Sequence, residues 1–189
     1  MEEKRKIFEK FKIKEIVFLA IVSAACMVTC AVMPLVVSLQ TTVFGIAQLV
    51  TSLQIGIFYT IGVMRVRKTG SFFMIALLTG LFQLLMAPAM FFSNIILGIL
   101  LELVALIFFK GFTSNKAIYV CVSLYNPLSL PFNVLYNYLF GEEAMVAVFS
   151  AVPWLTVVMT LAVIGVSILG VFCGSKIFKE LERSGAIKK

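Results

Sequence analysis

The chain has 189 residues and a formal net charge of +7; 61% of its residues are hydrophobic and only 13% are charged. Soluble domains are about half apolar and about a quarter charged, so this chain has too few polar side chains to cover a soluble surface. The composition excludes an ordinary soluble enzyme, a disordered tail and a disulfide scaffold. It indicates an integral membrane protein built of helices.

Residues 1–15 form a charged N-terminal segment in which Ile7, Phe8 and Phe11 share one helical face. This pattern predicts a short amphipathic helix on the inner leaflet, with partner binding as the alternative. Apolar runs long enough to cross a bilayer follow it. We expect an all-α bundle of six transmembrane helices at residues 16–37, 43–64, 72–89, 91–109, 117–140 and 151–177. Residues 178–189 are then a basic cytoplasmic tail, and 16–177 the transmembrane domain.

The 16 basic residues of the chain fall into four groups. They lie in residues 4–14, in residues 65–68, at positions 110 and 116, and in residues 176–189. With six spans all four groups face the same side, and basic loops are typical of the cytoplasmic side. We therefore expect both termini to be cytoplasmic. The positive charge then faces anionic lipid, and we expect no nucleic-acid partner.

Catalytic and metal-binding chemistry has little support in the residue types. The chain has no histidine, which removes most zinc and copper sites and most general-base catalysis. The four cysteines lie in apolar runs without a CxxC pair, as buried free thiols do. No GxxxxGK[ST] loop for ATP occurs. We expect no catalytic residue, no metal and no cofactor, and thus no enzyme.

Glu102 is the one ionisable residue deep in a predicted span. A carboxylate in hydrocarbon needs a partner or a proton. It could form a cation or proton site, contact a substrate, or bond a neighbouring helix in a structural role. Its position nearer the cytoplasmic end favours a structural or partner-contact role.

A stripe of asparagines follows one face of the fifth predicted helix, at Asn126, Asn133 and Asn137. Pro127 and Pro131 lie between them, so we expect this helix to be kinked or broken. The stripe could line a cavity or make hydrogen bonds between helices.

Amides, hydroxyls and aromatic rings concentrate at the outer ends of the predicted helices. We expect a pocket there that opens outward and binds a small polar or aromatic molecule. The predicted substrate-binding residues are Gln40, Thr41, Gln48, Asn94, Asn126, Asn133, Asn137 and Trp154. Trp154 could instead belong to an interfacial aromatic belt. The outer connections have no basic residue, which argues against a strongly anionic ligand, and residues 34–42 are our candidate for the gating loop.

Small residues four positions apart occur in two predicted helices. They are Ala20 with Ala24 in the first and Gly170 with Gly174 in the sixth. Such pairs let helices approach closely, either inside the bundle or toward another protein.

Taken together, the whole chain resembles in architecture a substrate-binding S component of an energy-coupling factor (ECF) transporter. The features that carry the resemblance are six helices, termini inside, no ATPase motif and the A-x-x-x-A motif at Ala20 and Ala24. In detail the chain looks most like the S components of the Trep_Strep/MptD type. That similarity lies in residues 12–15, 65–70 and 98–103.

The resemblance implies a multi-pass protein of a bacterial cell membrane that binds a micronutrient, such as a vitamin, from outside. It implies partnership with a transmembrane coupling subunit and two cytoplasmic ATPase subunits, and Ala20 and Ala24 would dock against the coupling subunit. The alternatives are a secondary carrier that uses an ion gradient through Glu102, a structural membrane subunit without a ligand, and a membrane enzyme.

Overall fold

The computed structural model describes residues 9–30, 44–85, 88–140 and 153–186. Within these ranges the chain forms six α-helices and no β-strand, so the predicted all-helical class is confirmed. The helices are α1 (Ile13–Thr29), α3 (Ile46–Arg65), α4 (Ser71–Leu84), α5 (Pro88–Phe109), α6 (Asn115–Phe140) and α8 (Pro153–Arg183).

Among the described residues, four helical segments are long and apolar enough to cross a membrane: Ile46–Arg65, Met90–Phe109, Asn115–Tyr136 and Pro153–Arg183. Helix α4 has 14 residues. At about 1.5 Å per residue it is shorter than a hydrocarbon core of about 30 Å. Helix α1 has 17 residues, and the end of the first predicted span, residues 31–37, lies outside the described residues. A count of six spans therefore stays a prediction.

Two predicted helix boundaries are wrong. The run at 72–89 does not form one helix, because α4 ends at Leu84 and Pro88 already begins α5. Proline has no N–H and its fixed φ suits the first turn of a helix, so Pro88 marks a start. The last helix continues past residue 177 to Arg183, because Phe178 is buried in the core.

Helix α6 runs without interruption through Pro127 and Pro131, so of the two expected outcomes the break is wrong, and a kink stays a prediction. Proline removes one backbone hydrogen bond. In apolar helices that loss is tolerated when neighbouring groups satisfy the freed carbonyls. Side chains of α6 pack against α3, α5 and α8, which holds the helix in place.

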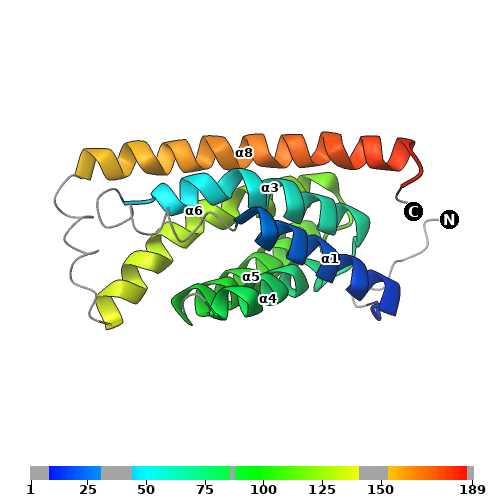
Figure 1. Ribbon diagram of the computed structural model, residues 1–189, viewed down its shortest axis with the longest axis horizontal. Coiled ribbons are helices and arrows are strands. Elements are labelled where there is room, and N and C mark those ends of the chain that lie inside the picture. Colours follow the sequence, from blue (N-terminus) through cyan, green and yellow to red (C-terminus); the bar gives the residue numbers. More distant parts are fainter. Residues whose placement is uncertain (1–8, 31–43, 86–87, 141–152, 187–189) are drawn as a thin grey trace.

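Helix α8 lies along α3 for much of its length (Figure 1). A Cβ atom on Gly174 would lie 2.7 Å from the carbonyl oxygen of Ile57, and one on Gly170 would lie 2.8 Å from that of Leu53. A Cβ atom on Gly56 would in turn lie 2.9 Å from Gly170. Only glycine permits this approach of two backbones, so the Gly170–Gly174 pair serves internal packing.

The core centres on four aromatic rings contributed by α3, α4, the α5–α6 connection and α6. The ring of Tyr59 lies 5.4 Å from Phe72 and 5.2 Å from Tyr125, and Phe72 lies 5.9 Å from Phe112. Offset and edge-on pairs at such distances are favourable. All four side chains are buried, so this cluster joins the helices at the centre of the bundle.

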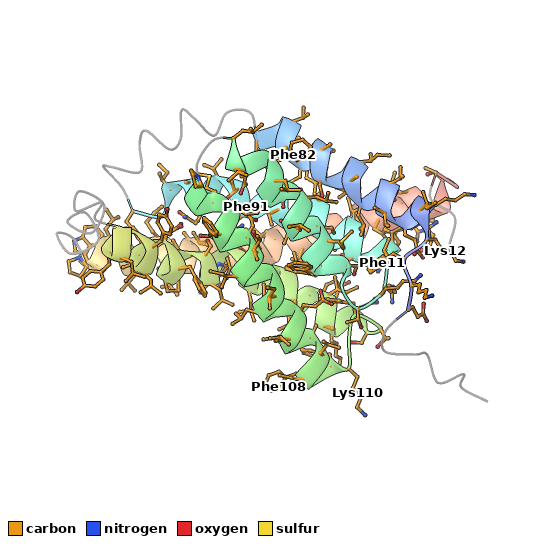
Figure 2. The ribbon with its side chains drawn as sticks, turned by 90° about the horizontal axis from the view of Figure 1, so that it is seen from below. Phe11, Lys12, Phe82, Phe91, Phe108 and Lys110 are labelled. Atoms are coloured by element: carbon orange, nitrogen blue, oxygen red, sulfur yellow. The ribbon has the colours of Figure 1, made fainter. Side chains whose placement is uncertain are left out.

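The surface of the bundle is rich in large apolar side chains. Figure 2 shows Phe108 on the outer surface of α5 and Phe82 near the end of α4; they are 74% and 46% exposed. On α8, exposed side chains include Val157, Leu161 and Leu169. A soluble monomer rarely exposes such continuous apolar area, whereas lipid tails cover it without cost.

Candidate functional site

A cavity of about 440 Å³ opens between α6 and α8. These helices diverge toward the end that lies opposite the start of α1 and the end of α8 (Figure 1). The wall residues of this α6–α8 cavity are Phe44, Pro127, Leu130, Pro131, Val134, Leu135, Tyr138, Thr156 and Thr160. The volume falls in the range of small-molecule sites, about 300–1,000 Å³.

Few polar groups line the α6–α8 cavity. Thr156 and Thr160 lie one turn apart on α8, and the Thr160 hydroxyl donates to the carbonyl oxygen of Thr156 at 2.8 Å. The oxygen of that hydroxyl can still accept a hydrogen bond from a ligand. Because Pro131 has no N–H, the carbonyl of Pro127 lacks its usual helical donor. Among the described residues of the lining, the Tyr138 phenol is the one ionisable group, so this part of the cavity suits an uncharged, mainly apolar ligand.

Predicted substrate residues lie at several depths, and those with described side chains stand outside the lining of the α6–α8 cavity. Gln48, Asn94 and Asn126 are buried, Asn133 is half-buried, and Trp154 is 68% exposed. Gln40 and Thr41 lie outside the described residues, as does the gating candidate 34–42. Asn137 is part of α6, but its side chain is not described. A substrate role for any of these residues stays a prediction.

Asn94 belongs to a buried chain of polar side chains. Its amide nitrogen donates to Gln83 Oε1 and to the Met90 carbonyl oxygen, and its Oδ1 accepts from the Tyr125 hydroxyl. These bonds fasten α5 to α4 and α6, which favours a structural role for this amide.

A second buried pair joins α3 to α4: the hydroxyls of Tyr59 and Thr79 lie 2.6 Å apart. Sequence reasoning missed Tyr59, Thr79, Gln83 and Tyr125 as a linked group. The available signal was the spacing of Thr79 and Gln83, which places two polar residues on one face of an apolar helix.

Gln48 differs from these polar side chains, which all have hydrogen-bond partners. The side chain is 8% exposed, and its Oε1 has no hydrogen-bond partner among the described residues. Its backbone carbonyl accepts from the hydroxyls of Thr51 and Ser52. An unsatisfied buried acceptor carries a free-energy cost, so Gln48 is suited to receive a donor from water or a ligand.

Glu102 of α5 caps the N-terminus of α4. Its Oε1 accepts from the N–H of Gly70 and its Oε2 accepts from the N–H of Phe73 at 3.2 Å. Gly70 has a φ of +94°, which glycine adopts readily. The first N–H groups of a helix have no partner within it, and a carboxylate satisfies them. Of the roles considered for Glu102, this geometry favours the structural one.

Lys68 fastens the segment before α1 to the connection between α3 and α4. Its ammonium donates to the Lys10 carbonyl oxygen at 2.9 Å and to Glu15 Oε2 at 2.8 Å. The N–H of Lys12 donates to the same Glu15 oxygen at 2.7 Å. Burial acts to raise the pKa of Glu15, but the hydrogen bonds and the positive charges of Lys68 and Lys12 hold this pKa below its usual value.

The segments that carry basic residues meet at this end of the bundle, which we call the basic end. The Arg67 guanidinium donates to the Thr113 carbonyl oxygen at 3.4 Å, which links it to the connection before α6. Lys179 of α8 lines the same cavity as Arg65 and Lys68. Figure 2 places Lys12 and Lys110 in the same half of the molecule. This grouping agrees with one shared side for the basic segments.

Ala20 and Ala24 lie on the outer side of α1. Both are half-buried, between the buried Leu19 and Ser23 and the exposed Ile21, which is 61% exposed. The small residues of α8 are engaged with α3, whereas this pair of alanines is partly open.

A family model described as "Hypothetical bacterial integral membrane protein (Trep_Strep)" matches residues 13–181. No curated protein and no solved structure matches the chain.

Proposed function

The chain belongs to the Trep_Strep family of hypothetical bacterial integral membrane proteins, and on that premise we propose that it is the substrate-binding subunit of an ECF-type importer. In this role it captures a small micronutrient outside the cell. A transmembrane coupling subunit and two cytoplasmic ATPase subunits then drive delivery. The chain binds and delivers its ligand and performs no catalysis of its own.

The observation that carries this proposal is the α6–α8 cavity. It lies between diverging helices away from the basic end, and its walls are apolar with a few hydroxyls. Basic segments favour the cytoplasmic side, so the cavity faces outward in the proposed orientation, with both termini inside. A ligand that enters from outside meets a site of small-molecule size.

The exposed side of α1 supports a docking surface for the coupling subunit. Ala20 and Ala24 offer a shallow strip beside Ile21 and Val28, which are 61% and 75% exposed. Small residues in such a strip admit a second helix at short distance. The proposed partner surface therefore lies on α1, away from the α6–α8 cavity.

A secondary carrier would need a group that binds the coupling ion. Glu102 is the acid that sequence reasoning offered for that task, and both of its oxygens accept backbone hydrogen bonds at the α4 N-terminus. This arrangement gives the carrier alternative no support.

The proposal is tested by replacing Ala20 and Ala24 together with leucine and co-expressing the variant with ECF coupling and ATPase subunits. The expected result is loss of the complex and of micronutrient uptake, with the folded protein and its ligand occupancy retained. Gly165→Leu is the matched control, because a Cβ atom there meets nothing within 4 Å. Normal complex formation by the double variant would refute the docking surface, and uptake without ATPase subunits would refute the ECF role.

A further inference from the structure

A second cavity, of about 550 Å³, lies at the basic end. Among the described residues, four basic and three acidic side chains take part in its lining. They are Arg65, Arg67, Lys68 and Lys179, with Glu9, Glu15 and Glu182. Met64, Val66 and Phe178 add buried apolar walls. We call this the basic-end cavity, and its described lining has a surplus of one positive charge.

The positive charges of the basic-end cavity differ in how they are used. Lys68 is occupied by Glu15 at 2.8 Å and lies 3.8 Å from Glu9. Arg67 donates from its Nε to the Met64 carbonyl oxygen at 3.2 Å, in addition to its bond to Thr113. Within the described parts of the chain, neither Arg65 nor Lys179 is engaged in an ion pair. These two groups are therefore the donors available to an incoming anion.

The apolar surface next to the basic-end cavity indicates what kind of anion fits. On α8, Ile168 and Phe172 are 53% and 54% exposed, and they lie about three and two turns before the cavity-lining Lys179 on the same face of the helix. The Lys176 ammonium lies 4.5 Å from the centre of the Phe172 ring, so positive charge also flanks this strip. An anion with attached alkyl chains would place its charge in the cavity and its chains along α8.

We propose that the basic-end cavity binds the phosphodiester head group of an anionic phospholipid such as phosphatidylglycerol, held by Arg65 and Lys179. A phosphodiester carries one negative charge and so balances the surplus of the lining. Guanidinium and ammonium groups are strong donors to phosphate oxygens. Basic pockets between helices at the cytoplasmic face are typical sites for anionic head groups. This inference needs only a membrane-spanning chain and does not depend on the ECF role.

The test uses the full chain, purified in detergent and exchanged into equal amounts of phosphatidylglycerol and phosphatidylcholine with identical acyl chains. Native mass spectrometry should show preferential retention of phosphatidylglycerol. In Arg65→Gln/Lys179→Gln that retention should fall by roughly fivefold for each charge removed. Lys110→Gln/Lys116→Gln is the matched control, because both lysines are exposed and lie outside the lining. It should retain the lipid.

Several results would overturn the proposal. One is equal retention of the two lipids, and another is equal loss in the pocket variant and the control. Binding of free glycerol phosphate as tight as that of the lipid would assign the cavity to a soluble anion. Unchanged lipid retention together with loss of a protein complex in the pocket variant would assign it to a protein partner. If the double variant fails to fold, Arg65→Lys, which keeps the charge, still allows the retention of phosphatidylglycerol to be measured.

Discussion

The two ends of the bundle are held by different kinds of contact. At the basic end, Glu102 caps α4 and Lys68 fastens the segment before α1, while Gly174 brings α8 onto α3 nearby. At the opposite end, α6 and α8 diverge around an apolar cavity, beside a small buried cluster of Phe44, Leu130 and Val163. Hydrogen bonds and an ion pair hold the basic end together, whereas the described residues of the opposite end enclose a space of small-molecule size. Substitutions should therefore cost stability at the first and binding at the second.

The largest effect is expected where α8 meets α3. Gly174→Leu would drive a side chain into the Ile57 carbonyl, which lies 2.7 Å from the Cβ position. Overpacking against backbone should destabilise the fold by about 3 kcal/mol or more. The loss of stability is measured by thermal unfolding in detergent, in which Gly174→Leu is compared with Gly165→Leu on the open side of α8. Equal unfolding temperatures for the two variants would contradict the packing assigned to this contact.

The next effect concerns Glu102. Alanine at this position leaves the N–H groups of Gly70 and Phe73 without their acceptor, a loss of about 2–3 kcal/mol. Glu102→Gln keeps one acceptor oxygen and should lose less than alanine. Chemical or thermal unfolding of both variants in detergent shows which of them has lost more stability. If glutamine were as harmful as alanine, a role for the negative charge itself would replace simple capping.

A smaller effect is expected at the opposite end. Thr160→Val removes a hydroxyl from the α6–α8 cavity and keeps its shape, so ligand affinity should fall by about tenfold, the equivalent of one hydrogen bond. The unfolding temperature should change little. Calorimetric titration with the identified ligand gives the affinity. A loss of stability with unchanged affinity would show that this end is held as tightly as the basic end.

The smallest effect is pH-dependent. The Lys68–Glu15 contact lowers the pKa of Glu15, so its stabilisation is present above the usual glutamate pKa of about 4.3 and is lost as pH falls through the lowered pKa. At neutral pH we expect the free energy of unfolding of the wild type to exceed that of Lys68→Met by less than about 1 kcal/mol. The difference should shrink toward acidic pH. Unfolding curves at several pH values, with Lys14→Met as control, test this; a difference independent of pH would contradict it.

Sequence patterns predicted the helices better than the contacts between them. Long apolar runs placed α3, α5 and α6 within a few residues of their observed bounds, because a lipid-facing helix must be apolar along its length. The apolar run continues across Pro88, so the sequence pattern predicts this residue in the preceding helix, whereas it begins α5. Gly170 and Gly174 suggested close packing, but the identity of the partner helix is a tertiary property.

The site was harder to predict than the fold, for a physical reason. Polar residues in a membrane span draw attention, yet Asn94 and Glu102 use their polar atoms to join helices. The α6–α8 cavity is lined largely by apolar side chains such as Leu130 and Val134, which in sequence look like any other lipid-facing residue. Divergence of two helices, and not a residue type, creates the space.

The most direct test of the account is native mass spectrometry of the protein purified from cells grown on rich medium. Leu135 lines the α6–α8 cavity, whereas Leu139 lies one turn further along α6, outside the lining. We predict that wild type and Leu139→Trp retain a non-lipid small molecule and that Leu135→Trp does not. A bare wild-type chain, still bare after incubation with a panel of vitamins, would contradict the binding role, and retention by Leu135→Trp would contradict the site.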